Sequence, residues 1–186
     1  DEKKEKKESK RLPIVSGKFD FRPSFVLGKD GPIAKGVPDY QVRQSQITLA
    51  ENIQKAFEDE KHLVAEAATG TGKSYANLLA AFEKAIGTQS PVVISTHTIA
   101  LQEQLMEKDV PFLLEKLGLA DKVQVALAKG RGNYVSIRRA HIAIKEKQKG
   151  YTKLAEWLNN TTDGTKSSLS FNVDALTWSR ARSDTD

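Results

Sequence analysis

The stretch from His62 to Ala81, HLVAEAATGTGKSYANLLAA, constrains the fold of this chain more than any other. It begins with a short apolar run, continues through a loop of Thr and Gly, and ends in residues that favour a helix. A strand, a tight loop and a helix in this order form a phosphate-binding loop, in which backbone N–H groups and the helix dipole face an anion. The pattern predicts a nucleotide site, with Lys73 on the β- and γ-phosphates and the Ser74 hydroxyl on Mg²⁺.

The loop departs from the general G-x-x-x-x-G-K-[ST] pattern at its first position, where this chain has Ala67. Gly70 and Gly72 remain, so the inner turn keeps access to positive φ. The alternative, a solvated loop between a strand and a helix, is disfavoured by the order of strand, loop, Lys-Ser and helix. We predict that the nucleotide is bound by the whole loop, which consists of Ala67, Ala68, Thr69, Gly70, Thr71, Gly72, Lys73 and Ser74.

Length and composition limit the class of protein. The 186 residues leave room for one domain with a core and part of a second. No apolar run approaches the roughly 20 residues of a membrane span, so no membrane partner is predicted. The chain has no cysteine, which excludes disulfides and fits a reducing cytoplasm. Because it starts at Asp1 rather than at Met and stops at Ser183–Asp186 without a helix end, we expect a fragment of a longer protein.

Hydrophobic periodicity predicts an α/β fold. Apolar residues at helical spacing indicate a helix over 43–58, and the helix after the loop should end near Gly87. Short apolar runs at 62–66, 92–95 and 123–128 indicate strands, with a helix from about Thr98 and another that starts at Asp109 as its N-cap. Strands that alternate with helices favour a parallel sheet flanked by helices.

Three regions follow from this reading. Residues 1–39 form a charged arm and an irregular, proline-containing lead-in, and residues 40–128 form the first part of the nucleotide-binding domain. Residues 129–186 form a small, mainly helical insertion after the third strand, with helices predicted over 134–147, 151–159 and 173–180. Core packing is the favoured role of its two tryptophans, Trp157 and Trp178, over base stacking.

Positive charge is concentrated in the insertion. Residues 129–153 contain eight basic residues and one acid, so this stretch alone carries more positive charge than the chain's net of +5. Such a local excess indicates an anionic polymer as partner, although a helix with a solvated basic face would give the same pattern.

Several blocks together point to a family. The upstream YQVRQSQ (40–46), the loop EAATGTGKS, VVISTHTIALQEQL (92–105) and ALAKGRGNY (126–134) occur in this order. In order and spacing the chain resembles the DinG/XPD-like branch of superfamily 2 helicases over roughly residues 27–186. The P-loop is shared with many NTPases, whereas the STHTIALQEQL and KGRGNY blocks are far more specific. The resemblance implies a RecA-like P-loop domain, ATP and Mg²⁺ as cofactors, and single-stranded or forked DNA as partner.

The resemblance also implies roles for single residues. Arg43 and Gln46 match the region that contacts the adenine end of ATP, and a polar residue at an exposed helix start is the less favoured alternative for Gln46. Thr96 and Thr98 match a loop that touches the single-strand backbone, and Thr98 can also serve as an N-cap. The nucleic-acid-binding residues implied in this way, together with the cations and Tyr of the insertion, are Thr96, Thr98, Lys129, Arg131, Tyr134, Arg138 and Arg139.

The KGRGNY block matches the point at which the iron–sulfur domain of this family begins. The first cluster cysteine would stand two residues after the tyrosine, where this chain has Ser136, and a serine hydroxyl does not replace a thiolate on iron. A four-cysteine cluster is therefore not expected. Tyr134 could stack on a base or seal the domain junction, and the sequence does not decide between these roles.

Hydrolysis needs groups that the 186 residues do not show. No DExH-type acid box and no second RecA-like domain are present to hold Mg²⁺, orient water and supply an arginine finger. We therefore expect an ATP-binding half-site with part of a DNA path, which in a longer protein drives 5′→3′ unwinding, a polarity taken from the resemblance alone. A nucleic-acid-binding module with a vestigial NTPase is the alternative, and a P-loop kinase is a weaker third.

Overall fold

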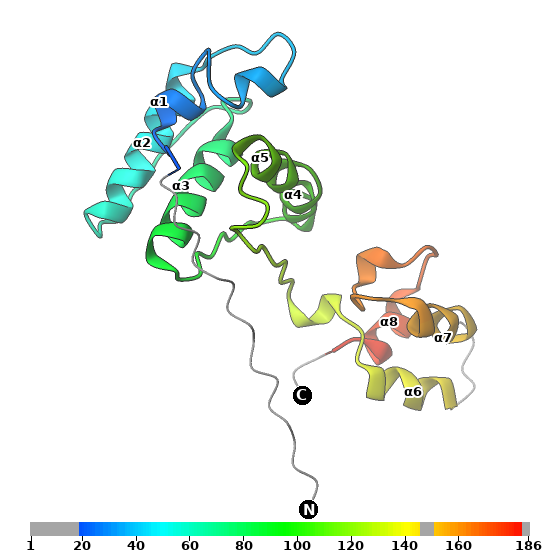
Figure 1. Cartoon of the computed structure of the whole chain (residues 1–186). Coiled ribbons are helices and arrows are strands. Elements are labelled where there is room, and N and C mark those ends of the chain that lie inside the picture. Colours follow the sequence, from blue (N-terminus) through cyan, green and yellow to red (C-terminus); the bar gives the residue numbers. More distant parts are fainter. Residues whose placement is uncertain (1–18, 146–150, 184–186) are drawn as a thin grey trace, which may run out of the picture. The chain divides into compact units, whose positions relative to one another are not determined.

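The computed structural model describes residues 19–145 and 151–183, which form two units that meet in sequence at residues 126 and 127 (Figure 1). Each unit is described by itself. The charged arm falls largely in residues 1–18, and part of the basic stretch falls in residues 146–150, so both lie outside the described residues.

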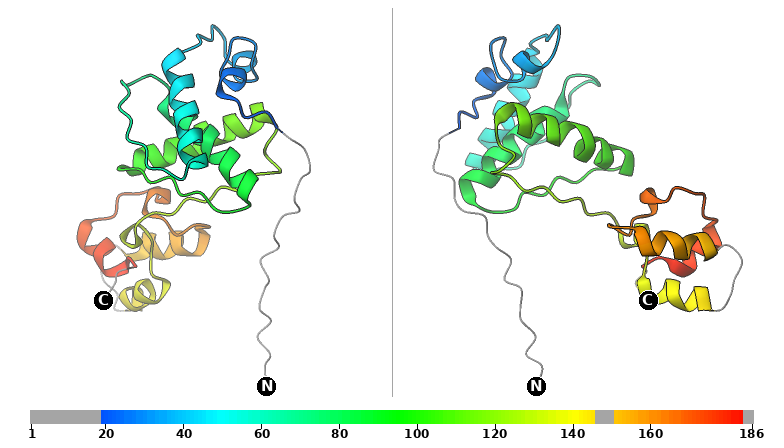
Figure 2. Two further views of the ribbon diagram at one scale, coloured as in Figure 1. Left: turned by 90° about the vertical axis from the view of Figure 1, so that its left-hand side faces the viewer. Right: turned by 45° about the vertical axis from the view of Figure 1, so that its right-hand side comes forward.

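The first unit is built from helices joined by extended segments. The helices have these bounds: α1 Pro23–Val26, a 3-10 turn Ala34–Gly36, α2 Gln44–Glu58, α3 Lys73–Thr88, α4 Ile99–Gln104, a π turn Leu105–Asp109 and α5 Val110–Leu117. Helix α2 lies beside α3 (Figures 1 and 2). Their packed faces contribute Ile47, Leu79 and Phe82 to a core that α5 completes with Leu113 and Leu117.

Residues at the ends of these helices determine where each helix begins or stops. Thr98 caps α4, because its hydroxyl accepts a hydrogen bond from the N–H of Leu101 at 3.2 Å, as predicted. Helix α3 runs through Gly87 and ends at Thr88, with Gln89 in the left-handed region. At the end of α5, Gly118 has a φ of 62° and carries the left-handed turn for which glycine is suited.

Asp109 differs from its prediction as the N-cap of a separate helix. Its backbone is helical and its side chain makes no cap bond. The segments α4, the π turn and α5 instead follow one another from Ile99 to Leu117 without a break. Val110 and Pro111 fit this arrangement because the wider π turn ahead of them leaves the proline without a clash in the preceding turn.

The predicted parallel sheet is not present among the described residues. The runs 62–66, 92–95 and 123–128 are extended, but none pairs with a neighbour. Val64 and Val93 are 98% and 87% exposed, although a strand of a parallel sheet is buried on both faces. The hydrogen bonds of a strand come only from the strands beside it, so an apolar run specifies a buried strand without supplying its partner.

The second unit is small and mainly helical. It contains a 3-10 turn Arg131–Asn133, α6 Ile137–Lys145, α7 Tyr151–Asn160, a 3-10 turn Lys166–Ser168 and α8 Ala175–Ala181. Tyr151, Leu154 and Ala181 lie in its core. Two antiparallel bridges, Tyr134 with Thr165 and Val135 with Arg182, join its early, middle and late segments.

Polar side chains fix the turns of this unit. Asp163 accepts hydrogen bonds from the N–H and the hydroxyl of Thr165, at 3.0 and 2.7 Å, and from Ser168 at 3.0 Å. The backbone hydrogen bond from Thr165 is the main reason that the pKa of Asp163 lies below its usual value. Trp178 is buried and its indole N–H donates to the carbonyl of Gly132 at 2.8 Å, which agrees with a packing role.

Candidate functional site

The predicted phosphate-binding loop leads directly into α3, whose first residue is Lys73. Gly70 and Gly72 have φ values of 77° and 83°, so both occupy the left-handed region that glycine enters without strain. Open space surrounds the position of a Cβ at Gly70, whereas a Cβ at Gly72 would overlap the side-chain amide of Gln46. The left-handed conformation therefore favours glycine at position 72, and a Cβ there would also displace the Gln46 side chain.

Two side chains from the start of α2 hold this loop. The Gln46 amide donates to the carbonyl of Gly72 at 2.9 Å, and the Arg43 guanidinium donates to the carbonyl of Gly70. Gln46 is 6% exposed, so it is not a polar residue on an exposed helix start. Whether these residues also meet adenine stays a prediction. The structure adds a function that the sequence did not indicate, which is to fix the backbone of the loop.

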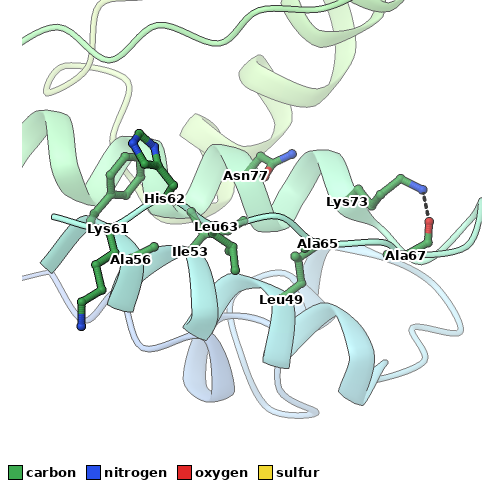
Figure 3. Close-up of a pocket in the computed structure, with 11 residues that line it drawn as sticks. Leu49, Ile53, Ala56, Lys61, His62, Leu63, Ala65, Ala67, Lys73 and Asn77 are labelled. Atoms are coloured by element: carbon green, nitrogen blue, oxygen red, sulfur yellow. Dashed lines mark hydrogen bonds between the residues drawn. The ribbon is translucent and has the colours of Figure 1, made fainter. Parts of the chain in front are cut away.

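Lys73 lies across the loop. Its ammonium group donates to the carbonyls of Ala67 and Ala68 at 2.6 and 2.9 Å (Figure 3 shows the contact with Ala67). The Thr71 hydroxyl also donates to the carbonyl of Ala68, at 2.9 Å. The lysine side chain is exposed. Its charge can therefore turn from backbone carbonyls to phosphate oxygens by rotation of the side chain.

Two cavities border the loop. The smaller, of about 410 Å³, lies between α2, α3 and residues 61–67, and apolar side chains such as Leu49, Ile53 and Leu63 line much of it (Figure 3). The larger, of about 910 Å³, combines loop residues with polar side chains and lies within the size range of small-molecule sites. Its lining includes Tyr40, Arg43, Gln46, Thr69, Gly70, Gly72, Lys73, Ser74, Tyr75, Gln104 and Asp109.

The larger cavity contains titratable groups that the sequence did not single out. Burial is the main cause that raises the pKa of Tyr75, and the charges of Asp109 and Tyr40 raise it further. Burial likewise raises the pKa of Asp109, against a hydrogen bond from Gln104 and the charge of Lys108. The only sequence signal for Tyr75 was its place after the Lys-Ser pair, and Asp109 was interpreted only as a helix cap.

The threonines of the second block lie at the start of α4. The Thr96 hydroxyl donates to the carbonyl of Thr98 at 3.1 Å, and the Thr98 hydroxyl serves as the cap described above. Thr96 is half-buried and Thr98 is exposed, so the cap of α4 faces solvent. The capping role leaves the predicted contact with a DNA backbone open, because a hydroxyl can accept one hydrogen bond and donate another.

In the second unit the predicted cations divide into two kinds. Arg131 and Arg138 are exposed, whereas Arg139 is half-buried and donates to the carbonyls of Arg180 and Ser179 at 3.2 and 3.1 Å. Lys129 donates to the Ser167 hydroxyl at 2.6 Å. The first two are therefore better placed to meet an anionic ligand, and the last two join segments of the unit.

Tyr134 and Ser136 both take part in the packing of this unit. The Tyr134 hydroxyl accepts a hydrogen bond from the N–H of Lys129 at 2.9 Å, and the Ser136 hydroxyl accepts one from the N–H of Arg139 at 3.4 Å. Ser136 thus stands at the start of α6 as a capping group. Among the described residues no group of three or more His, Cys, Asp or Glu side chains could hold a metal ion.

Comparison with known proteins now gives the family. Residues 39–167 match the family described as "Type III restriction enzyme, res subunit". The chain belongs to this family. The res-subunit domain is a RecA-like P-loop helicase domain, and the resemblance to DinG-type helicases is confirmed by the relatives described next.

Three curated relatives show the extent of the similarity. The chain is 34% identical over 160 residues to "ATP-dependent helicase DinG" of Mycobacterium tuberculosis (strain ATCC 25618 / H37Rv). The matched stretch covers 74% of this chain and 24% of that protein. It is 34% identical over 175 residues to "ATP-dependent DNA helicase YoaA" of Escherichia coli (strain K12), and this match covers 90% of the chain and 26% of that protein. It is 27% identical over 176 residues to "3'-5' exonuclease DinG" of Bacillus subtilis (strain 168), and this match covers 90% of the chain and 19% of that protein. The chain thus spans about a quarter of their length or less.

In the part of the chain that the structure describes, no helix is both long enough and apolar enough to cross a membrane.

Proposed function

We propose that this chain binds ATP–Mg and single-stranded or forked DNA, and that a longer protein containing it couples ATP hydrolysis to 5′→3′ unwinding of DNA. The observation that carries the proposal is the loop itself. Gly72 takes a left-handed conformation directly before the first turn of α3, next to a cavity of about 910 Å³. Backbone N–H groups at such a turn, Lys73 and the dipole of a 16-residue helix suit a polyphosphate.

The loop from Ala67 to Ser74 would surround the phosphates of the nucleotide. Arg43 and Gln46, which donate to the carbonyls of Gly70 and Gly72, would fix the loop and contact the adenine. Ser74 fits a Mg²⁺ ligand, because Mg²⁺ accepts one protein oxygen and takes the others from phosphates and water. When bound, the ion would neutralise charge on the β- and γ-phosphate oxygens.

DNA would contact Thr96 and Thr98 in the first unit and, considered separately, the cations of the second unit. Arg131 and Arg138 would meet backbone phosphates, with Lys129, Tyr134 and Arg139 in supporting contacts. We propose that this unit works without an iron–sulfur cluster at this position. The chain has no cysteine, and Ser136 serves as a cap of α6.

Hydrolysis by a longer protein should depend on DNA. We expect single-stranded DNA to raise ATP turnover, because bound DNA stabilises the closed arrangement in which helicases hydrolyse ATP. The measurement is the steady-state ATPase rate with and without single-stranded DNA, in a protein that contains this chain and the remaining length of its relatives. The same rate in both would contradict the helicase proposal and favour a P-loop NTPase that does not act on DNA. DNA binding without turnover would support the alternative of a vestigial site.

DNA binding by this chain should weaken as salt rises. Each phosphate contact with single-stranded DNA contributes about 0.7 to the slope of log K against log salt concentration. Arg138→Gln should therefore reduce that slope by about 0.7, and the same change at Arg131 should do likewise. The measurement is fluorescence anisotropy of a labelled single-stranded oligonucleotide at several salt concentrations.

Arg22→Gln is the matched control, because this exposed arginine pairs with Asp20 outside the second unit and its replacement should leave the slope unchanged. If the Arg131 and Arg138 variants both had the same salt slope as the unsubstituted chain, these two residues would be excluded from DNA binding.

A further inference from the structure

Asp109 is a carboxylate that lines the nucleotide cavity and lies outside the loop motif. It is 8% exposed and borders the same cavity as Gly72, Lys73 and Ser74. Among the described residues its hydrogen-bond partner is the amide of Gln104, at a distance of 3.4 Å, which is long for such a bond. A buried carboxylate with one weak partner retains unused acceptor capacity, which is costly unless another donor meets it.

The local backbone at Asp109 departs from a regular helix. Residues Leu105–Asp109 form a π turn between α4 and α5. Single π turns inside α-helices are rare and are frequent at functional sites, because the extra residue changes which side chains face a neighbour. Here the turn ends at Asp109, the residue that borders the cavity.

Two tyrosines share the cavity lining with Asp109. Tyr75 stacks on Phe112 with ring centroids 5.8 Å apart, and the charge of Asp109 contributes to raising the pKa of the Tyr75 hydroxyl. Tyr40 is fixed by a hydrogen bond from its OH to the carbonyl of Leu27 at 2.9 Å. Tyr40, Tyr75 and Asp109 therefore line one cavity.

The loop supplies the phosphate-binding groups of the same cavity. The Lys73 ammonium group is held by the carbonyls of Ala67 and Ala68. A carboxylate repels phosphates, so the part of a bound nucleotide that Asp109 can accept a hydrogen bond from is an uncharged donor. The donors of a nucleoside are its sugar hydroxyls and its exocyclic amine.

We propose that Asp109 is a specificity-determining residue of the nucleotide site, whose carboxylate accepts a hydrogen bond from a sugar hydroxyl or the exocyclic amine of the bound nucleoside. The proposal rests on the proposed function, since it names a contact within the same site. It predicts that the site discriminates against nucleotides that lack the donor. A hydrogen bond to a charged group corresponds to a preference of roughly tenfold to hundredfold.

The test measures the affinity of this chain for four ligands by titration calorimetry. They are ATP, 2′-deoxy-ATP, 3′-deoxy-ATP and purine riboside triphosphate, which lacks the exocyclic amine. We expect the unsubstituted chain to prefer ATP to at least one analogue by roughly tenfold or more, and Asp109→Asn to bind that analogue and ATP within about threefold of each other. The analogue that loses affinity identifies the donor.

Two further variants keep the test decisive. Glu107→Gln removes an exposed carboxylate of the same π turn and should retain the full preference. Asp109→Ala removes the acceptor altogether, and its thermal unfolding curve shows whether the fold is kept. A preference that is unchanged in both Asp109 variants, or an unsubstituted chain that binds all four nucleotides equally, would overturn the proposal and leave the proposed function intact. Failure of the unsubstituted chain to bind ATP would overturn both.

Discussion

Replacing Gly72 by alanine is expected to reduce the affinity of this chain for ATP by at least about tenfold and to lower its free energy of unfolding. The backbone φ of 83° at this position costs a residue with a Cβ about 1–2 kcal/mol. The new methyl group would also overlap the amide of Gln46, which now donates to the carbonyl of Gly72. The Gln46 side chain would have to turn away, which breaks its hydrogen bond to the loop and leaves the backbone around the phosphates less firmly held. Titration calorimetry with ATP and thermal unfolding measure the two effects.

Gly87→Ala is the matched control for this substitution. Gly87 lies within α3, has no left-handed φ, and has open space where a Cβ would stand. Alanine favours a helix interior over glycine by up to about 1 kcal/mol, so this variant should be as stable as the unsubstituted chain or more so. Its affinity for ATP should not change. Equal affinity for ATP in the Gly72 and Gly87 variants would show that the left-handed turn does not shape the site.

The contrast between these glycines shows what the sequence could predict. The loop follows from adjacent residues, because its turn and the start of α3 depend on local conformation at Gly70, Gly72 and Lys73. The cap at Thr98 is local in the same way. Such features are specified within a few residues, and the structure agrees with them.

The sheet and the place of Asp109 in the cavity depend on contacts between residues that are distant in the sequence. The three apolar runs have the composition of buried strands, but pairing is a property of neighbours, and Val64 and Val93 stay exposed among the described residues. Asp109 stands before Val-Pro, a pattern typical of an N-cap, yet the helix continues through it by a π turn. Its place in the cavity depends on α3 and α5 packing together, which no local pattern encodes.

The second large effect is expected from removing the charge of Lys73. Lys73→Ala is expected to reduce the affinity for ATP by roughly tenfold to hundredfold, the value of a charge-assisted hydrogen bond. In a longer protein it should reduce ATP turnover at least as far, because a phosphate-binding lysine acts on the transferred group. The fold should be unaffected, since the side chain is exposed and contacts only loop carbonyls. Calorimetry and thermal unfolding measure both quantities.

The two loop variants therefore differ in what they change besides affinity. Gly72→Ala should lower both the affinity and the unfolding temperature, whereas Lys73→Ala should lower the affinity alone. Lys55→Ala, at an exposed lysine of α2 that pairs with Asp59 at 3.5 Å, removes an equal charge away from the loop and should change neither. If Lys73→Ala also unfolded the chain at a lower temperature, its contacts with Ala67 and Ala68 would be structural. If it left the affinity unchanged, the ammonium group would stay on those carbonyls with nucleotide bound, and the backbone amides and the α3 dipole would bind the phosphates without it.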